Sequence, residues 1–321
     1  MTISKGVGLA IGWGVESTYG TPNATPTAWT EAVSCGIKQT GGANGTPTLR
    51  TRSIRHYAPK KLVTEGPIEA IGSYKGASFL GLLKMGMGAS SSSTPAGAQS
   101  EYTHTLTLAD ALSAYTFEVK PDSGELAKSL QFPGCKVGKI SLSVEQEDAL
   151  RATFDITGDG NMTEVTSTTV TYPTHENINW DDVACTINTV ATKIHSFSLD
   201  IDNALEVSTP LGQLDAQANE PKSERKVSGQ ISVILDGNTQ MALFQGMTEA
   251  NIVLTFTGSL IGGAIYHTFI IRIPRAVFTG GTPDINTDGP LMLEMPFDAY
   301  YDVANTLGEV QITATNTTAT I

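Results

Sequence analysis

The five histidines are the side chains of this sequence best suited to acid–base or metal chemistry: His56, His104, His175, His195 and His267. An imidazole titrates near neutral pH and is a frequent metal ligand. His104 and His267, however, lie in two similar stretches, YTHTLTL (102–108) and YHTFIIRI (266–273), and each stretch shows the apolar alternation of a strand. A histidine beside threonines on a strand usually packs and forms a local hydrogen bond. The pattern therefore favours structural histidines over a metal site.

Paired carboxylates offer a second kind of chemistry. Glu145 and Glu147 lie within VEQED, and Asp200 and Asp202 lie within LDID. Two carboxyl groups can cleave a glycosidic bond when they face each other across a cleft and one of them has a raised pKa. Clusters on one exposed strand face provide neither condition. The ordinary interpretation is a polar strand face, and the more specific hypothesis is that these four residues line an acidic pore.

Other motifs that would bind a cofactor are incomplete. GVGLAIGWG (6–14) has the glycine spacing of a phosphate-binding loop, but no strand precedes it and no convincing helix follows it. DITGDGN (155–161) lacks the terminal glutamate of a calcium-binding loop, and the three cysteines are far apart without metal-ligand spacing. The sequence contains no GxSxG, HExxH or P-loop lysine motif. We therefore expect no cofactor, no metal and no enzymatic activity.

The elements that must position these residues are mostly strands. Period-two alternation occurs in KISLSVEQ (139–146), RATFDIT (151–157) and GQISVIL (229–235), among others. Only GASFLGLLKMG (76–86) and NTQMALFQGM (238–247) look helical; both are short and both follow a strand. The sequence predicts an all-β protein with minor α content, in which each helix packs on the outer face of a sheet.

A repeat explains why two histidine strands are alike. The pairs Gly66 and Gly229, Leu80 and Leu243, and His104 and His267 all differ by 163 positions. Farther along the offset shortens: KISLSVEQED resembles LMLEMPFDAYYD (291–302), and RATFDITGDGN resembles GEVQITATNTT (308–318). The boundary falls in the threonine-rich stretch 161–174. We predict two tandem β-sandwich or barrel domains, residues 1–165 and 166–321, each with one short flanking helix.

The charge distribution is uneven. The formal net charge is −12 at pH 7, which argues against a sequence-reading nucleic-acid binder. The stretch from Glu31 to Glu65 contains no other acidic residue. Its segment at about 41–65 is either a solvated loop or an arm that docks on an acidic neighbour, for which another copy of the chain is the best partner. The arm residues are Arg50, Arg52, Arg55, Lys60 and Lys61.

The order of elements resembles that of the tail tube (major tail) proteins of long-tailed bacteriophages. The resemblance covers most of the chain and is carried by IGWGVESTYGTP (11–22), the strand and helix of 65–89, YTHTLTL, and FPGCKVGKISLSVEQEDALRATFDITG (132–158). It implies a virion tail protein whose domains form rings, usually of six, that stack into a hollow tube conducting double-stranded DNA. With two domains per chain, three chains would complete a pseudo-sixfold ring.

The resemblance also implies partners and a location. The partners are other copies of the chain and the tape measure, tail terminator and tail tip proteins, with no membrane. The amino-terminal run 1–14 is too short and irregular for a signal peptide, so we expect assembly in the host cytoplasm. The alternative is a carbohydrate- or receptor-binding β-sandwich adhesin, in which Trp13, Trp29, Tyr57 and Trp180 would line a sugar site. For a third class, an enzyme of unknown chemistry, the sequence offers no group of residues.

Overall fold

The structure is a computed structural model that describes residues 9–23, 25–47, 53–54, 56–93, 100–121, 128–166, 168–214, 218–234, 239–281, 283–284 and 292–321. Strands dominate these residues, and their pairing is antiparallel throughout. The helical elements described are α1 (Ser78–Met87), α2 (Thr239–Gln245) and the 3-10 turn η1 (Trp180–Asp182). The predicted all-β class with minor α content is therefore confirmed.

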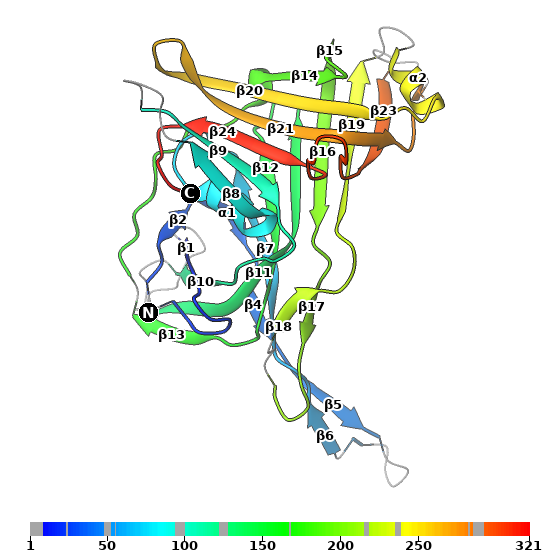
Figure 1. Ribbon diagram of the computed structural model, residues 1–321. Helices are drawn as coiled ribbons and strands as arrows, with labels where there is room; N and C mark the ends of the chain where they lie inside the picture. Colours follow the sequence, from blue (N-terminus) through cyan, green and yellow to red (C-terminus); the bar gives the residue numbers. More distant parts are fainter. Residues whose placement is uncertain are drawn as a thin grey trace.

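One long sheet, the main sheet, forms the middle of the molecule (Figure 1). Its neighbouring strands pair along seven to eight residues in most places. The order across it is β3 (Ala32–Cys35) with β4 (Lys38–Thr40), then β7 (Val63–Ile71), β12 (Arg151–Gly158), β11 (Lys128–Glu145), β16 (Ile194–Asp202), β19 (Lys226–Ile234) and β23 (Met292–Ala299).

Two further groups of strands continue from the main sheet. The end of β21 pairs with β23, so a second layer follows in the order β21 (Ile265–Phe278), β24 (Gln311–Asn316), β9 (Tyr102–Leu108) and β8 (Gly88–Ser93) on one side, and β20 (Ala250–Gly262), β14 (Val183–Ile187) and β15 (Val190–Thr192) on the other. The first part of β11 bends into a smaller sheet with β13 (Thr163–Thr166), β10 (Tyr115–Lys120), β1 (Ala10–Val15) and β2 (Ala28–Thr30).

Helix α1 lies inside this arrangement. It packs on β11 and is also covered by β2, β8 and β9, so every residue except Lys84 is buried. Gly86 makes the contact with β11 close, since a Cβ there would lie 2.5 Å from Ile140 Cδ1. The helix ends at Gly88, whose φ of 89° is the left-handed conformation that glycine adopts without strain. The helix therefore packs on the sheet as predicted, but other strands enclose it.

The two halves of the chain repeat one pairing pattern. On β7, Glu65 faces Lys38; on β19, Ser228 faces Asp200. Every residue pair between β7 and its partners β3 and β4 has a counterpart between β19 and β16. Adding 162 to the residue on β3 or β4 gives the residue on β16, and adding 163 to the residue on β7 gives the residue on β19. The matching ladders even share an irregularity at the same place, between residues 32 and 34 and between residues 194 and 196.

The pairing also corrects one sequence alignment within the repeat. β23 lies beside β19 in the register in which β12 lies beside β7, because Met295 faces Ile231 as Phe154 faces Ile68. The offset is 141, so β23 matches β12, whereas the sequence comparison aligns β23 with β11. The alignment of 308–318, which contains β24 (Gln311–Asn316), with β12 is wrong for the same reason. Strands with the same period-two alternation resemble each other, and the hydrogen-bonded register is needed to tell them apart.

At the same offset of 141, residues 277–278 and 283–284 match the middle of β11. Val277 faces Asp298 as Lys136 faces Thr157, and Asp284 on β22 (Pro283–Asp284) faces Met292 as Ser143 faces Arg151. The halves also pair with each other, because β11 pairs with β16 and β24 pairs with β9. Two domains that divide at about residue 165 therefore stay a prediction, and the strands form one continuous structure across that position.

Two hairpins extend away from the same end of the main sheet (Figure 1). The first arm consists of the described residues of 41–62 and contains β5 (Ala43–Thr46) and β6 (His56–Pro59). The second arm consists of those of 203–225 and contains β17 (Leu205–Ser208) and β18 (Ala218–Pro221). They connect β4 to β7 and β16 to β19, so they occupy matching places in the repeat.

Candidate assembly surfaces

The main sheet has one apolar face and one polar face. On β11, Ile140, Leu142 and Val144 are at most 4% exposed and contribute to the core, whereas the residues between them face the other side. The strand register carries this division across the sheet. One row on the polar face reads Glu69, Thr153, Ser141, Asp200, Ser228 and Asp298, from β7 to β23.

Carboxylates outnumber basic groups on this polar face. Its exposed or half-buried acidic residues are Glu65, Glu69, Glu145, Asp155, Asp200, Asp202, Glu294 and Asp298, and its basic ones are Lys38, Lys139, Arg151 and Lys226. Three of the basic groups are paired: Lys139 with Asp200 at 3.2 Å, Lys226 with Asp298 at 3.8 Å, and Arg151 with Glu69 at 3.2 Å. Glu65, Glu145, Asp155, Asp202 and Glu294 form no ion pair with a described residue. The polar face therefore carries negative charge that the described chain does not neutralise.

The structure brings together three of the four carboxylates predicted for a pore. Glu145, Asp200 and Asp202 lie on the polar face, on the adjacent strands β11 and β16. Asp200 accepts a hydrogen bond from Ser141 Oγ at 2.5 Å and also pairs with Lys139, whereas Glu145 and Asp202 stay exposed. Glu147 lies beyond the end of β11, in a turn where its φ is 67°, so it is at the rim of the face rather than on it.

The first arm is exposed along its described length. Lys60 and Lys61 lie between β6 and β7 with exposed side chains; Arg50, Arg52 and Arg55 lie outside the described residues. Two large apolar side chains of this arm are also exposed, Ile54 at 63% and Tyr57 at 76%. A positive segment with exposed apolar side chains is the composition expected of a segment that binds another protein.

Sequence reasoning missed the second arm. Its signal was present, because adding the repeat offset to the first arm gives residues 203–225. This segment is mainly acidic, with Glu206, Asp215, Glu220 and Glu224 against Lys222 and Arg225. It is tied to the body and to the other arm: Lys136 pairs with Glu220 at 3.4 Å, and the amide of Leu62 donates to the carbonyl of Leu214 at 2.7 Å.

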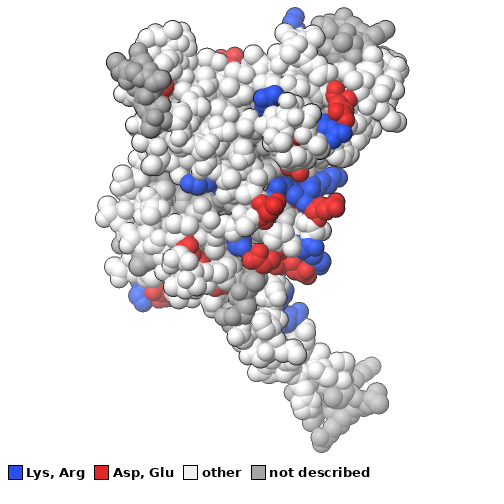
Figure 2. Space-filling model, in the orientation of Figure 1, with Lys and Arg blue, Asp and Glu red and all other residues white. Residues whose placement is uncertain are grey.

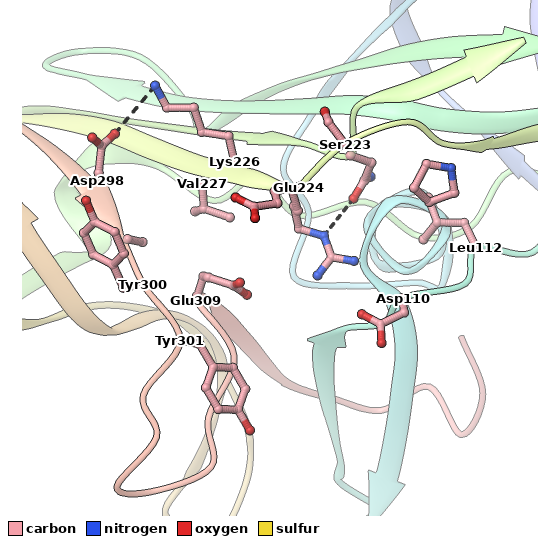
Figure 3. A pocket seen from close by; sticks show the side chains of 14 residues that line it. Asp110, Leu112, Ser223, Glu224, Lys226, Val227, Asp298, Tyr300, Tyr301 and Glu309 are labelled. Carbon is pink, nitrogen blue, oxygen red and sulfur yellow. Dashed lines mark hydrogen bonds and ion pairs between the residues drawn. The ribbon is translucent and has the colours of Figure 1, made fainter.

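A recess of about 570 Å³ lies at the base of the second arm (Figure 3). Its lining includes four carboxylates, Asp110, Glu224, Asp298 and Glu309, and the basic residues Arg225 and Lys226. Arg225 is held by Asn203 Oδ1 at 3.1 Å and by the carbonyl of Ala109. The basic groups are thus engaged within the chain, and the recess offers acceptors to a positively charged partner. Figure 2 shows acidic and basic side chains gathered together on the face above the arms, and few charges over the β20–β21 end.

Two of the five histidines, His104 and His267, are buried strand residues, and His56, His175 and His195 are exposed. His104 is fully buried; its Nε2 donates a hydrogen bond to the carbonyl oxygen of Thr318 at 2.8 Å, and its Nδ1 shares a hydrogen bond with Ser92 Oγ at 2.7 Å. His267 is 3% exposed, and burial lowers the pKa of its imidazole. Within the described residues, no three His, Cys, Asp or Glu side chains gather as metal ligands.

The aromatic residues considered for a sugar site do not gather either. Trp13 and Trp29 are about 4–5% exposed in the small sheet, where Trp13 packs against Phe117 at a ring distance of 6.4 Å. Tyr57 lies on the first arm and Trp180 lies in η1. A platform for a sugar ring needs exposed aromatic faces side by side, and the two buried tryptophans cannot supply them.

These surfaces define a class of protein: an all-β structural unit with a broad polar sheet face and projecting arms. No helix in the described part of the chain is both long and apolar enough to span a membrane. The sequence matches the model of the phage tail tube protein family over residues 6–299, so the chain belongs to that family. The resemblance seen in the sequence is confirmed, and the protein is a structural component of the virion tail. No curated protein matches the sequence.

Proposed function

We propose that copies of this chain polymerise as stacked rings and form a hollow tail tube that conducts double-stranded DNA to the host. Family membership supports the tube, and the polar face of the main sheet supports its wall. A surface of serine, threonine and unneutralised carboxylates repels DNA phosphates and offers few lysines or arginines that would hold them. The single observation that carries the proposal is this broad, net-negative sheet face.

Three chains per ring follow from the repeat. Because each chain presents two matching halves, three chains supply the six units usual in the family, in a pseudo-sixfold ring with closed cyclic symmetry. The tube assembles in the host cytoplasm, with the tape measure, tail terminator and tail tip proteins as further partners.

The arms provide contacts between copies in this proposal. The first arm is basic and exposed, and the recess at the base of the second arm is mainly acidic, so the two surfaces are complementary in charge. Docking a positive arm on the acidic surface of another copy orients rings relative to each other.

Electron microscopy of concentrated purified protein tests the proposal. We expect long hollow rods whose averaged end-on view shows sixfold features arising from three chains. Discrete particles at every concentration, even after addition of tail tip complexes as an assembly start, would reject a tube. A different ring number would reject the three-chain ring and leave the tube in place.

A further inference from the structure

The main sheet has two edge segments without a described partner, β3 with β4 at one end and residues 279–281 with β22 at the other. β3 and β4 pair with β7 on one side, and no described strand pairs with their other side. Their counterpart in the second half, β16, is paired on both sides, with β19 and with β11. The first half of the chain therefore exposes an edge that the second half has covered.

The opposite end of the sheet shows the reverse situation. The middle of β11 is paired on both sides, with β12 and with β16. Its counterpart, residues 279–281 and β22, lies beside β23 and has no described strand on its other side. The edge formed by β3 and β4 has no partner at the place where β16 pairs with β11. The edge formed by residues 279–281 and β22 has no partner at the place where β11 pairs with β16.

We propose that the junction between β11 and β16 within one chain is the template for the junction between neighbouring chains, so that residues 279–281 and β22 of one copy pair with the edge formed by β3 and β4 of the next. This inference rests on the proposed ring and specifies its contact. Within the chain, Lys139 faces Asp202, Ile140 faces Ile201, Leu142 faces Leu199 and Ser143 faces Ser198. The repeat offsets convert these pairs into the proposed pairs between copies. Adding 141 to the β11 residue gives its counterpart beside β23, and subtracting 162 from the β16 residue gives its counterpart on or between β3 and β4. Gly280 then faces Thr40, Gly281 faces Gln39, Pro283 faces Ile37 and Asp284 faces Gly36.

Backbone geometry supports the comparison at both edges. The β11 ladder on β12 contains an extra residue between Val137 and Lys139, and the matching stretch contains one extra residue between Phe278 and Pro283. The amide of Thr279 donates to the carbonyl of Pro296 at 2.8 Å, which keeps this stretch beside β23. Exposed edges of this kind are otherwise sites of uncontrolled aggregation, and pairing head to tail around a ring removes them.

Cysteine cross-linking between two different variants tests the register. In a Cys35→Ser background, Ile37→Cys protein is mixed with Pro283→Cys protein under assembly conditions, and thiols are joined by mild oxidation or a short bifunctional reagent. Residues directly opposite in a ladder have Cβ atoms about 4.5–5.5 Å apart. We expect a cross-linked dimer in this mixture on non-reducing gels, and none with either variant alone.

A mixture of Ile37→Cys with Asp284→Cys is the matched control. Neighbouring residues of a strand point to opposite faces, so this pair should lose the dimer band. Equal cross-linking in both mixtures, or none in the first, overturns the register. Microscopy of the same samples separates this from a failure of the proposed function: tubes without the specific cross-link reject only the register.

A doubly substituted chain, Ile37→Cys with Pro283→Cys, tests the ring number. Its cross-linked species on non-reducing gels should end at three copies, and larger species reject only the three-chain ring.

Discussion

Reversing the charge of the polar face should make the tube retain DNA. Glu145, Asp155 and Glu294 are exposed and form no ion pair with a described residue, so replacing all three with lysine breaks no ion pair of the described residues. Exposed substitutions of this kind usually change the free energy of unfolding by no more than about 0.5 kcal/mol each. The face, which has eight carboxylates and four basic groups, would then have five and seven.

The size of the effect follows from counterion release. Suppose that three of the new lysines contact DNA phosphates at the same time. The logarithm of the DNA-binding constant then decreases with the logarithm of the salt concentration, with a slope of about −2.7. Raising the salt from about 50 to about 200 mM then weakens retention roughly 40-fold. The assay assembles tubes in the presence of short duplex DNA, digests free DNA with a nuclease and measures the protected DNA that sediments with the tubes.

A matched variant separates the channel from the outer surface. Glu31, Glu164 and Asp181 are also exposed but lie outside the main sheet, so their replacement with lysine adds the same charge elsewhere. Because this also removes the exposed ion pair of Glu164 with Lys128, at 2.9 Å, melting of the variant is compared with that of the wild type first. Its tubes should bind DNA that the nuclease removes. If intact tubes of the polar-face variant protect no more DNA at low salt than wild-type tubes do, the polar face is not the channel wall.

Three other predictions concern the repeat, the arm and a buried histidine. Gly66→Ala and Gly229→Ala should each lower the free energy of unfolding by about 1–3 kcal/mol in thermal melts, because a Cβ would overlap the carbonyl oxygens of Gly36 and Ser198. Gly138→Ala, where the nearest atom is 3.6 Å away, is the control, and equal melting of all three variants would contradict the argument. Glutamate at Arg50, Arg52 and Arg55, or at Lys60 and Lys61, should leave melting unchanged and abolish tubes in micrographs; normal tubes would refute the arm's role. Because burial lowers the pKa of His267, the unfolded chain binds a proton more readily, so stability should fall as the pH drops below about 6.5 and should fall less in His267→Gln. Identical pH dependence in the two proteins would count against that assignment.

The sequence predicts the strands that follow from local alternation of apolar and polar residues. It does not predict which strands pair with each other. Alternation in 139–146 and 151–157 correctly indicates strands, because one face of each is buried and the other is polar. The same alternation cannot show which strand of one half matches which strand of the other, so β23 is aligned with β11 although it lies where β12 would. The enclosure of α1 is likewise set by β2, β8 and β9, which reach it from distant parts of the chain.

The candidate surfaces show the same limit. Asp200 and Asp202 can be placed on one face from their spacing, since residues two apart on a strand share a face. Glu145 belongs to β11, and only the ladder between β11 and β16 shows that it shares this face. Whether each carboxylate keeps its charge available depends on neighbouring strands: Asp200 meets Lys139 across the ladder, whereas Asp202, directly opposite Lys139, forms no ion pair with a described residue. Sequence spacing within one strand contains no information about that choice.

In a chain with two matching halves the two arms can carry opposite charges, which is impossible for identical chains with a single domain and a single arm. In a ring of identical single domains every arm carries the same charge, and like-charged arms repel their neighbours. Here the first arm is basic and the second is mainly acidic, although they occupy matching places in the repeat. Around the proposed three-chain ring, positive and negative arms would alternate, so each arm has oppositely charged neighbours within the ring. The amide of Leu62 already joins the base of the first arm to Leu214 of the second inside one chain. Divergence of the two halves would therefore let adjacent arms of the proposed ring attract each other, whereas six identical arms of like charge would repel.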